Sequence, residues 1–205
     1  DLRNVVNDLK EVIDTQISLP EGYHVEFGGQ FESEEAASRT LLFTSFISII
    51  VIFLLIYHEF HNLKESAIIL LNLPLALIGG VFTLLFTSGE ISIPAIIGFI
   101  SLFGIATRNG MLLINRYKTL QHEGGKTLIE SVVHGSLDRL NPILMTALTS
   151  ALALIPLAVN GDLPGNEIQS PMAQVILGGL LSSTLLNGFI VPIVYLWMAK
   201  KETKA

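Results

Sequence analysis

Five long apolar blocks, separated by shorter polar segments, run through most of the chain. A helix needs about 20 mostly apolar residues to cross the hydrocarbon of a bilayer, and these blocks are close to that length. They cover residues 40–57, 66–87, 93–115, 142–159 and 172–198. The pattern predicts an all-α integral membrane bundle of five transmembrane helices at residues 40–198, with a short tail at 199–205.

The first 39 residues contain no such block. Apolar residues recur at helical spacing over residues 2–17, residues 19–22 break the pattern, and residues 23–27 alternate as a strand does. Residues 32–39 are charged and predict a helical lead into the first span. Because one helix and one strand cannot bury a core alone, we interpret residues 1–39 as a small α+β remnant, the C-terminal end of a larger domain outside the cytoplasm.

All charged residues except Arg108 lie outside the apolar blocks. Eight Lys and Arg residues occur in segments 57–65, 116–141 and 199–205, and none occurs in segments 88–92 and 160–171. Lys and Arg are enriched in cytoplasmic loops. The distribution therefore predicts that the N-terminal segment is outside and the C-terminal tail is in the cytoplasm.

Half of the residues are apolar and only 15% are charged, which argues against a soluble enzyme. The chain has no Cys, so it can form neither a disulfide nor a thiolate metal site. It also lacks a Gly-rich phosphate loop, a nucleophile elbow and a zinc-protease motif. We expect no catalytic residues, no cofactor and no nucleic-acid partner, and we interpret the chain as a piece of a longer polypeptide, since it opens on Asp1 without a targeting signal.

Two histidines are spaced so that they could share one face of a helix. His58 and His61, with Glu59 or Glu65, could bind a divalent ion. The spacing fixes no third ligand, and His is common at the end of a membrane span. We therefore favour ordinary interfacial histidines and predict no metal site.

One charged residue, Arg108, lies well inside an apolar block. A guanidinium stays charged at any relevant pH, and placing it in hydrocarbon costs at least about 2.5 kcal/mol. It could instead extend toward the interface near Arg116, but two helical turns, about 11 Å, separate the two positions. We therefore interpret Arg108 as a functional residue that faces the interior of the bundle.

An interior cation needs an acidic partner, yet none of the five blocks contains Asp or Glu between its ends. The carboxylates must then come from another part of the polypeptide or from another subunit. Protonatable carboxylates beside a fixed cation can serve as a proton relay, because protonation releases the ion pair.

Other residues in the blocks suggest interhelical contacts. Polar side chains that could assist Arg108 or simply bond across helices are Asn72, Thr107, Asn109, Thr146, Thr149 and Ser150. Small residues that indicate close helix packing are Gly98, Gly104, Gly110, Gly178, Gly179, Ser182 and Ser183. Pro74 and Pro192 lie inside blocks and predict kinks.

Several motifs occur in a fixed order: GGQFE at residues 28–32, FGIATRNGMLLINRY in the third block, RLNPILMT at residues 139–146, and Gly178-Gly179 followed by Thr184, Pro192 and Tyr195. With these motifs, nearly the whole sequence resembles the resistance-nodulation-division (RND) efflux transporters. GGQFE and FGIATRNG are most similar to the heavy-metal-efflux branch of that family, the Cus and Czc type.

The resemblance implies specific roles for three residues. RND chains have twelve spans in two similar halves, so this chain corresponds to spans eight to twelve and the end of the preceding periplasmic insertion. The family's proton relay uses carboxylates of the fourth span, a Lys-Asn pair in the tenth and a Thr in the eleventh. Arg108 and Asn109 stand at the Lys-Asn place and Thr146 at the Thr place. An Arg can act there as a fixed counter-ion but not as a proton carrier.

The resemblance also implies a setting and partners. It implies a multi-pass protein of the bacterial inner membrane that exports heavy-metal cations by proton antiport, with its N-terminal segment in the periplasm. The implied partners are the N-terminal half of the same polypeptide, a homotrimer, a periplasmic adaptor and an outer-membrane channel. An RND exporter of drugs or other amphiphiles, and a scaffold module that does not transport, stay open as alternatives. The cost of Arg108 favours transport.

The distribution of Lys and Arg generates a topology prediction. Reporter fusions placed after Asp162 and after Lys204 of the full-length protein should report opposite compartments, with the second in the cytoplasm. Alkaline phosphatase and green fluorescent protein fusions measure this directly. Finding both positions on the same side would overturn the count of five spans.

Overall fold

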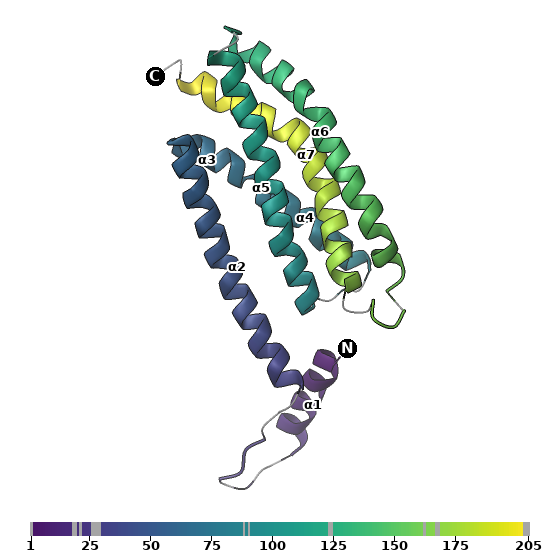
Figure 1. Cartoon of the computed structure of the whole chain (residues 1–205). Coiled ribbons are helices and arrows are strands. Elements are labelled where there is room, and N and C mark those ends of the chain that lie inside the picture. Colours follow the sequence, from purple (N-terminus) through teal and green to yellow (C-terminus); the bar gives the residue numbers. More distant parts are fainter. Residues whose placement is uncertain are drawn as a thin grey trace.

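The fold is a bundle of long helices with one shorter helix beyond its end (Figure 1). The computed structural model describes residues 2–17, 20, 22–25, 30–87, 89, 91–122, 125–161, 163–166 and 169–202. In chain order the helices are α1 (Leu2–Gln16), α2 (Gln30–Phe60), α3 (Leu63–Leu70), α4 (Asn72–Phe86), α5 (Ile93–His122), α6 (Leu128–Val159) and α7 (Gln169–Glu202).

Five segments of these helices are long and apolar enough to cross a bilayer, the same number as the apolar blocks of the sequence. Helices α2, α5, α6 and α7 each supply one span, and α3 and α4 together supply the other. The helical lead predicted before the first span is also confirmed, because α2 begins at Gln30. Helix α1 and the end of α7 lie at opposite ends of the bundle (Figure 1).

The second span is broken at Leu71, between α3 and α4. Pro74 has no N–H and therefore cannot bond to the carbonyl of Leu70, which removes one helical hydrogen bond at the break. The side chain of Asn62 accepts a hydrogen bond from the backbone N–H of Lys64 and caps the start of α3. The kink predicted from Pro74 thus takes the form of a helix break, whereas Pro192 lies inside the continuous helix α7.

The polar segment between the third and fourth blocks is mostly helical. Helix α5 extends to His122 and α6 begins at Leu128, so only a few residues connect them. Thr127 and Glu130 form a capping box at the start of α6, in which each side chain bonds to the other residue's backbone N–H. Apolar patterning marks the membrane-embedded part of a helix, and the capping residues mark where this helix begins.

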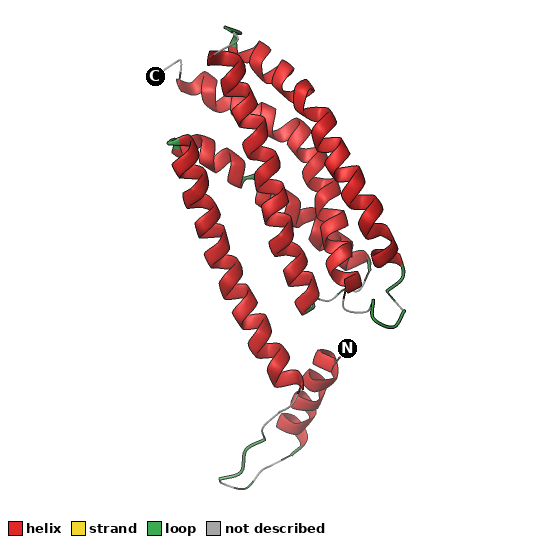
Figure 2. Cartoon of the chain, viewed as in Figure 1, coloured by secondary structure: helices red, strands yellow, loops and turns green. Residues whose placement is uncertain are grey.

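The strand expected at residues 23–27 is not formed at Tyr23, His24 and Val25, and residues 26 and 27 lie outside the described part of the chain. Across the described residues the secondary structure is helix, turn and coil (Figure 2). A β-strand needs a neighbour to take its backbone hydrogen bonds. The alternating apolar pattern of residues 23–27 does not provide that neighbour. The expected α+β character of the N-terminal segment is therefore wrong for the described residues. The helix expected there is present as α1.

Helix α7 packs against α4, α5 and α6, and small residues allow its close approach to α4. A Cβ added to Gly178 would overlap Thr83 and the carbonyl oxygen of Gly79. The Ser182 hydroxyl donates a hydrogen bond of 2.7 Å to the carbonyl oxygen of Leu75. The two helices therefore pack through backbone surfaces, as is common where lipid gives no hydrophobic drive for association.

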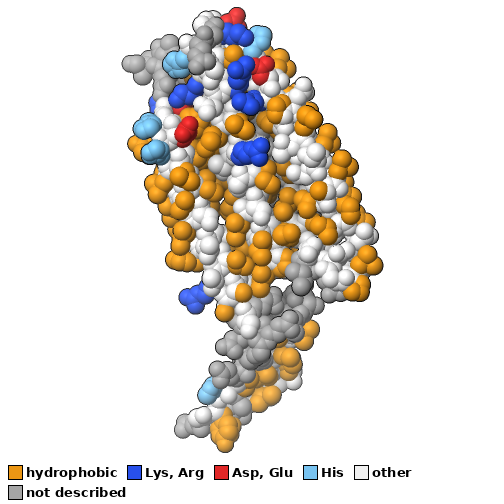
Figure 3. Space-filling view, viewed as in Figure 1, with side chains coloured by type: hydrophobic (Ala, Val, Ile, Leu, Met, Phe, Trp, Pro, Cys, Tyr) orange, Lys and Arg blue, Asp and Glu red, His pale blue; other side chains and the backbone are white. Residues whose placement is uncertain are grey.

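Helices α2 and α6 are the least covered helices of the bundle. In the most apolar window of α6 none of the residues is buried, and in that of α2 only 6% are buried. Large apolar side chains cover the middle of the space-filling surface, and charged ones gather toward the end away from α1 (Figure 3). This surface suits contact with lipid or with further transmembrane helices.

The contact between α4 and α7 generates a prediction about stability. Gly178→Ala in the full-length protein should lower the midpoint of thermal unfolding, because the new methyl group overlaps α4 and overpacking costs about 1–3 kcal/mol. Gly188→Ala on the same helix is the matched control, since nothing lies within 4 Å of its added Cβ. Thermal unfolding in detergent measures both. Equal midpoints for the two variants would contradict the proposed close contact.

Candidate functional site

Arg108 lies near the middle of α5, in the span formed by Ile93–His122. Its side chain is exposed, so it points away from the described bundle. The described residues place no carboxylate in an ion pair with it. Within the described part of the chain, therefore, the cation predicted to face a bundle interior lacks its acidic partner.

The neighbours of Arg108 on α5 are buried and polar. Thr107 is 7% exposed and Asn109 is 5% exposed. The Thr107 hydroxyl and the Asn109 amide nitrogen have no hydrogen-bond partner among the described residues. Buried polar groups are nearly always hydrogen-bonded, so this stretch of α5 has bonding capacity that the described residues do not use.

Thr146 lies on α6, which packs against α5. The side chain is half-buried, and its hydroxyl donates a 2.8 Å hydrogen bond to the carbonyl oxygen of Pro142 on its own helix. Thr149 donates in the same way to the carbonyl oxygen of Met145, at 2.6 Å. In the described part of the chain no hydrogen bond joins Thr146 to Arg108 or Asn109, so the three predicted residues lie on adjacent helices without direct bonds.

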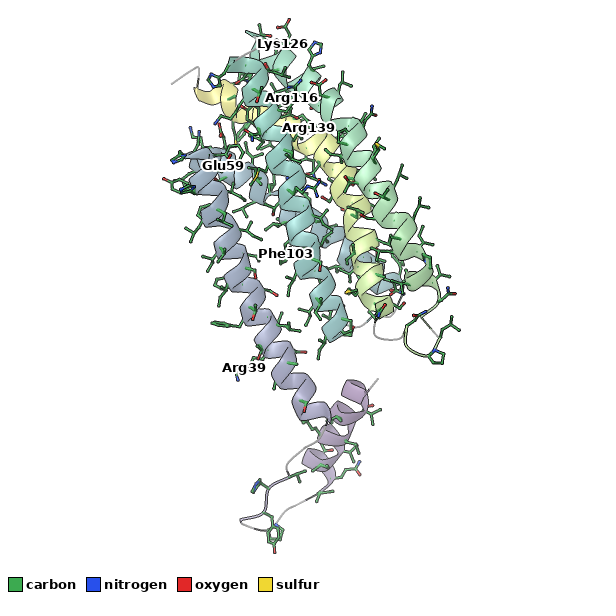
Figure 4. The ribbon with its side chains drawn as sticks, viewed as in Figure 1. Arg39, Glu59, Phe103, Arg116, Lys126 and Arg139 are labelled. Carbon is green, nitrogen blue, oxygen red and sulfur yellow. The ribbon has the colours of Figure 1, made fainter. Side chains whose placement is uncertain are left out.

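Other cations find acidic partners at the end of the bundle away from α1. Arg116 donates to Asp138 through two nitrogens, at 2.9 and 2.6 Å, and thereby ties α5 to α6. Lys118 pairs with Glu65 at 2.9 Å and lies 5.5 Å from the centroid of the Phe60 ring. Arg116, Lys126, Arg139 and Glu59 all lie toward this end, and Phe103 lies in the middle (Figure 4).

Arg139 is a residue that the sequence reasoning missed. It was expected in a loop, but it lies inside α6, and its side chain is half-buried. Its Nε atom is buried without a hydrogen-bond partner among the described residues. The RLNPILMT motif contained the signal, because an Arg three residues before a helical Pro and next to an apolar block can belong to the helix. Arg139 is thus a second cation with unused bonding capacity.

The two histidines considered as metal ligands lie close together near the end of α2. The centroids of the His58 and His61 rings are 5.7 Å apart. Glu65, the third ligand considered for this pair, forms an ion pair with Lys118 instead. No group of three metal-ligating side chains occurs among the described residues.

The glycines predicted to mediate packing have different surroundings. A Cβ on Gly179 would overlap Leu102 of α5, and one on Gly110 would overlap the amide of Asn72. Nothing lies within 4 Å of a Cβ added to Gly104, which faces away from the described helices. Gly104 and Arg108, one helical turn apart, are both exposed, so this face of α5 is uncovered in the described structure.

Arg108 and its polar neighbours Thr107 and Asn109 are suited to binding an acidic group. A permanent cation, unpaired among the described residues, lies beside buried amide and hydroxyl groups with free bonding capacity. Such an arrangement can hold and release an acidic group that changes its protonation. It contains no nucleophile and base in hydrogen-bond contact.

Comparison with known proteins identifies the family. A sequence model of the AcrB/AcrD/AcrF family matches residues 1–199. The chain is 34% identical over its full length to the cobalt-zinc-cadmium resistance protein CzcA of Cupriavidus metallidurans, and spans 19% of that protein. It is 39% identical over 95% of its length to protein HelA of Legionella pneumophila, of which it spans 18%. The cation efflux system protein CusA of Escherichia coli is 29% identical over the whole chain, which spans 20% of it.

A solved structure described as a heavy metal efflux pump has the same fold. It superposes with a TM-score of 0.82 at 34% identity, over 98% of this chain and 20% of the other. The chain thus spans about a fifth of the length of its relatives. These matches confirm the resemblance to RND transporters and to their heavy-metal-efflux branch, and the chain belongs to the AcrB/AcrD/AcrF family.

Proposed function

We propose that the chain forms the last five spans of a bacterial inner-membrane pump that exports heavy-metal cations in exchange for protons. The observation that carries the proposal is Arg108, a permanent cation at membrane depth with no acidic partner among the described residues. Such a residue is costly in a bundle that only needs to pack. Its retention is explained if carboxylates outside this chain bind it.

The proposed coupling depends on a change in charge. When the carboxylates are ionised they pair with Arg108, and when they take up protons the attraction is lost. Arg108 itself keeps its charge throughout, because a guanidinium does not deprotonate in a protein. The helices that carry the two partners can then move apart or together with each proton taken up and released.

Asn109 and Thr146 are proposed to assist this pair. The Asn109 amide nitrogen has no partner among the described residues and can donate a hydrogen bond to a carboxylate when the helices packed over it move apart. Thr146 lies on the neighbouring helix α6, and its hydroxyl oxygen can still accept a bond while it donates to Pro142. Both would orient the carboxylates with respect to Arg108.

The proposed cargo follows from the relatives. CzcA is named for cobalt, zinc and cadmium resistance, and CusA for cation efflux. The described residues contain no cluster of metal-ligating side chains, so we place the metal route in the remaining four-fifths of the full-length protein. This chain would supply the energy-coupling part.

The proposed orientation has the N-terminal segment in the periplasm and the C-terminus in the cytoplasm. Arg116, Lys126 and Arg139 lie toward one end of the bundle (Figure 4), which is the distribution that favours the cytoplasmic side. The proposed partners are two further copies of the full-length protein, a periplasmic adaptor and an outer-membrane channel, as the family resemblance implies.

Arg108→Ala in the full-length pump should abolish metal export, because the carboxylates lose the counter-ion that favours their charged form. Resistance of an efflux-deficient host to cobalt, zinc, cadmium, nickel, copper and silver should fall to that of cells without the pump. Arg108→Lys should retain part of the resistance, since position and charge survive. Minimum inhibitory concentrations, with expression matched by immunoblot, measure this.

The matched control is Arg116→Ala, which removes a cation from the same helix that is paired with Asp138 at a partly exposed site. It should leave resistance nearly unchanged, because exposed ion pairs contribute about 0–1 kcal/mol. Normal resistance with Arg108→Ala would show that the guanidinium only reaches the interface, and the proposal would fail. Resistance to drugs instead of metals would support the drug-exporting alternative.

A further inference from the structure

Asn72 of α4 lies against Gly110 of α5, and the two helices approach closely at this point. Asn72 is the first residue of α4, immediately after the break at Leu71, and it is fully buried. Gly110 is buried on α5, two residues after Arg108. A Cβ added to Gly110 would overlap the amide nitrogen of Asn72. The missing side chain of Gly110 therefore makes a notch that holds the Asn72 amide.

Apolar side chains enclose this notch on both sides. One buried cluster contains Ile69, Leu113 and Ile114, and the other contains Leu73 and Ala106. Both clusters combine residues of α5 with residues of the broken span. The Asn72 amide thus lies between two apolar layers, and neither its oxygen nor its nitrogen has a hydrogen-bond partner among the described residues.

Only one axial register of α5 against α4 accommodates the amide. A slip of one turn, about 5.4 Å, would bring Ala106 or Ile114 opposite Asn72, and both side chains are fully buried in packed clusters. The other glycines of α5 cannot replace Gly110. Gly98 faces Met172 and Val175 of α7, and Gly104 has nothing within 4 Å. A single polar side chain in an apolar interface is a known means of fixing register.

We propose that Asn72 is a positioning residue, whose amide, held in the Gly110 notch, fixes the axial register of α5 and thereby the depth of Arg108 and Asn109 in the membrane. This inference rests on the proposed function of Arg108. Arg108 and Asn109 directly precede Gly110, so a rigid helix transmits the position of the notch to them.

The first experiment tests the contact without reference to transport. In the full-length pump, Gly110→Ala should lower the midpoint of thermal unfolding, and the same change in an Asn72→Ala background should lower it much less, because the overlapping amide is gone. Gly188→Ala on α7, where nothing lies within 4 Å of the added Cβ, is the control and should have little effect. If Gly110→Ala lowers the midpoint equally in both backgrounds, Asn72 does not occupy the notch and the inference is wrong.

The second experiment separates positioning from packing. Asn72→Ala removes the amide and leaves the Gly110 notch empty. It should change the thermal midpoint little, because it also removes two buried polar atoms that have no hydrogen-bond partner among the described residues. Proton-coupled zinc transport in proteoliposomes should nevertheless fall by about tenfold or more, because the register is no longer fixed. A purely structural role would predict loss of both stability and transport, and normal transport with Asn72→Ala would overturn the inference.

The reciprocal variant Asn72→Gly with Gly110→Asn places the amide on α5 and the notch on α4. It should transport better than either single change, because the same register is restored. Failure of that recovery in a folded double variant would contradict the inference. Arg108→Ala in the same assay distinguishes the two proposals. If it transports normally, the function proposed for Arg108 fails, whereas normal transport by Asn72→Ala alone leaves that function standing.

Discussion

A guanidinium inside a bilayer needs a negatively charged partner. The proposed mechanism depends on where Arg108 finds that partner. Arg108 points away from the described helices, and the described residues give it no carboxylate. By contrast, Arg116 and Lys118 form ion pairs near the end of the same helix. We therefore propose that carboxylates from outside this chain meet Arg108 on the uncovered face of α5.

The helices packed around α5 support the helix that carries Arg108. Helix α7 approaches α4 through Gly178 and Ser182, and it also packs against α5. The notch at Gly110 receives Asn72 from the start of α4. Close packing of this kind leaves little freedom to slide, because cores respond to changes as small as one methylene group. The chain thus combines a rigid support formed by α4, α5 and α7 with the exposed helices α2 and α6.

Hydropathy alone predicted the five spans, because crossing a bilayer imposes a length and an apolar composition that can be read from any one segment. Pro74 likewise marked the break in the second span. The strand expected at residues 23–27 was wrong for the described residues, since pairing depends on a neighbour that the local pattern does not contain. The contact between Asn72 and Gly110 was beyond local patterns, because it depends on which helices meet. The helical position of Arg139 was missed although the capping residues Thr127 and Glu130 mark the start of α6 in the sequence.

The central claim is that metal export by the full-length protein is coupled to protons. The most direct measurement uses the purified full-length protein in liposomes that contain a pH-sensitive dye and a zinc-sensitive dye. With an imposed pH gradient, zinc should move against the direction of proton flow, and it should stop when the gradient is collapsed with an ionophore. Zinc movement that is unchanged by collapse of the gradient, with no accompanying proton flux, would contradict the account.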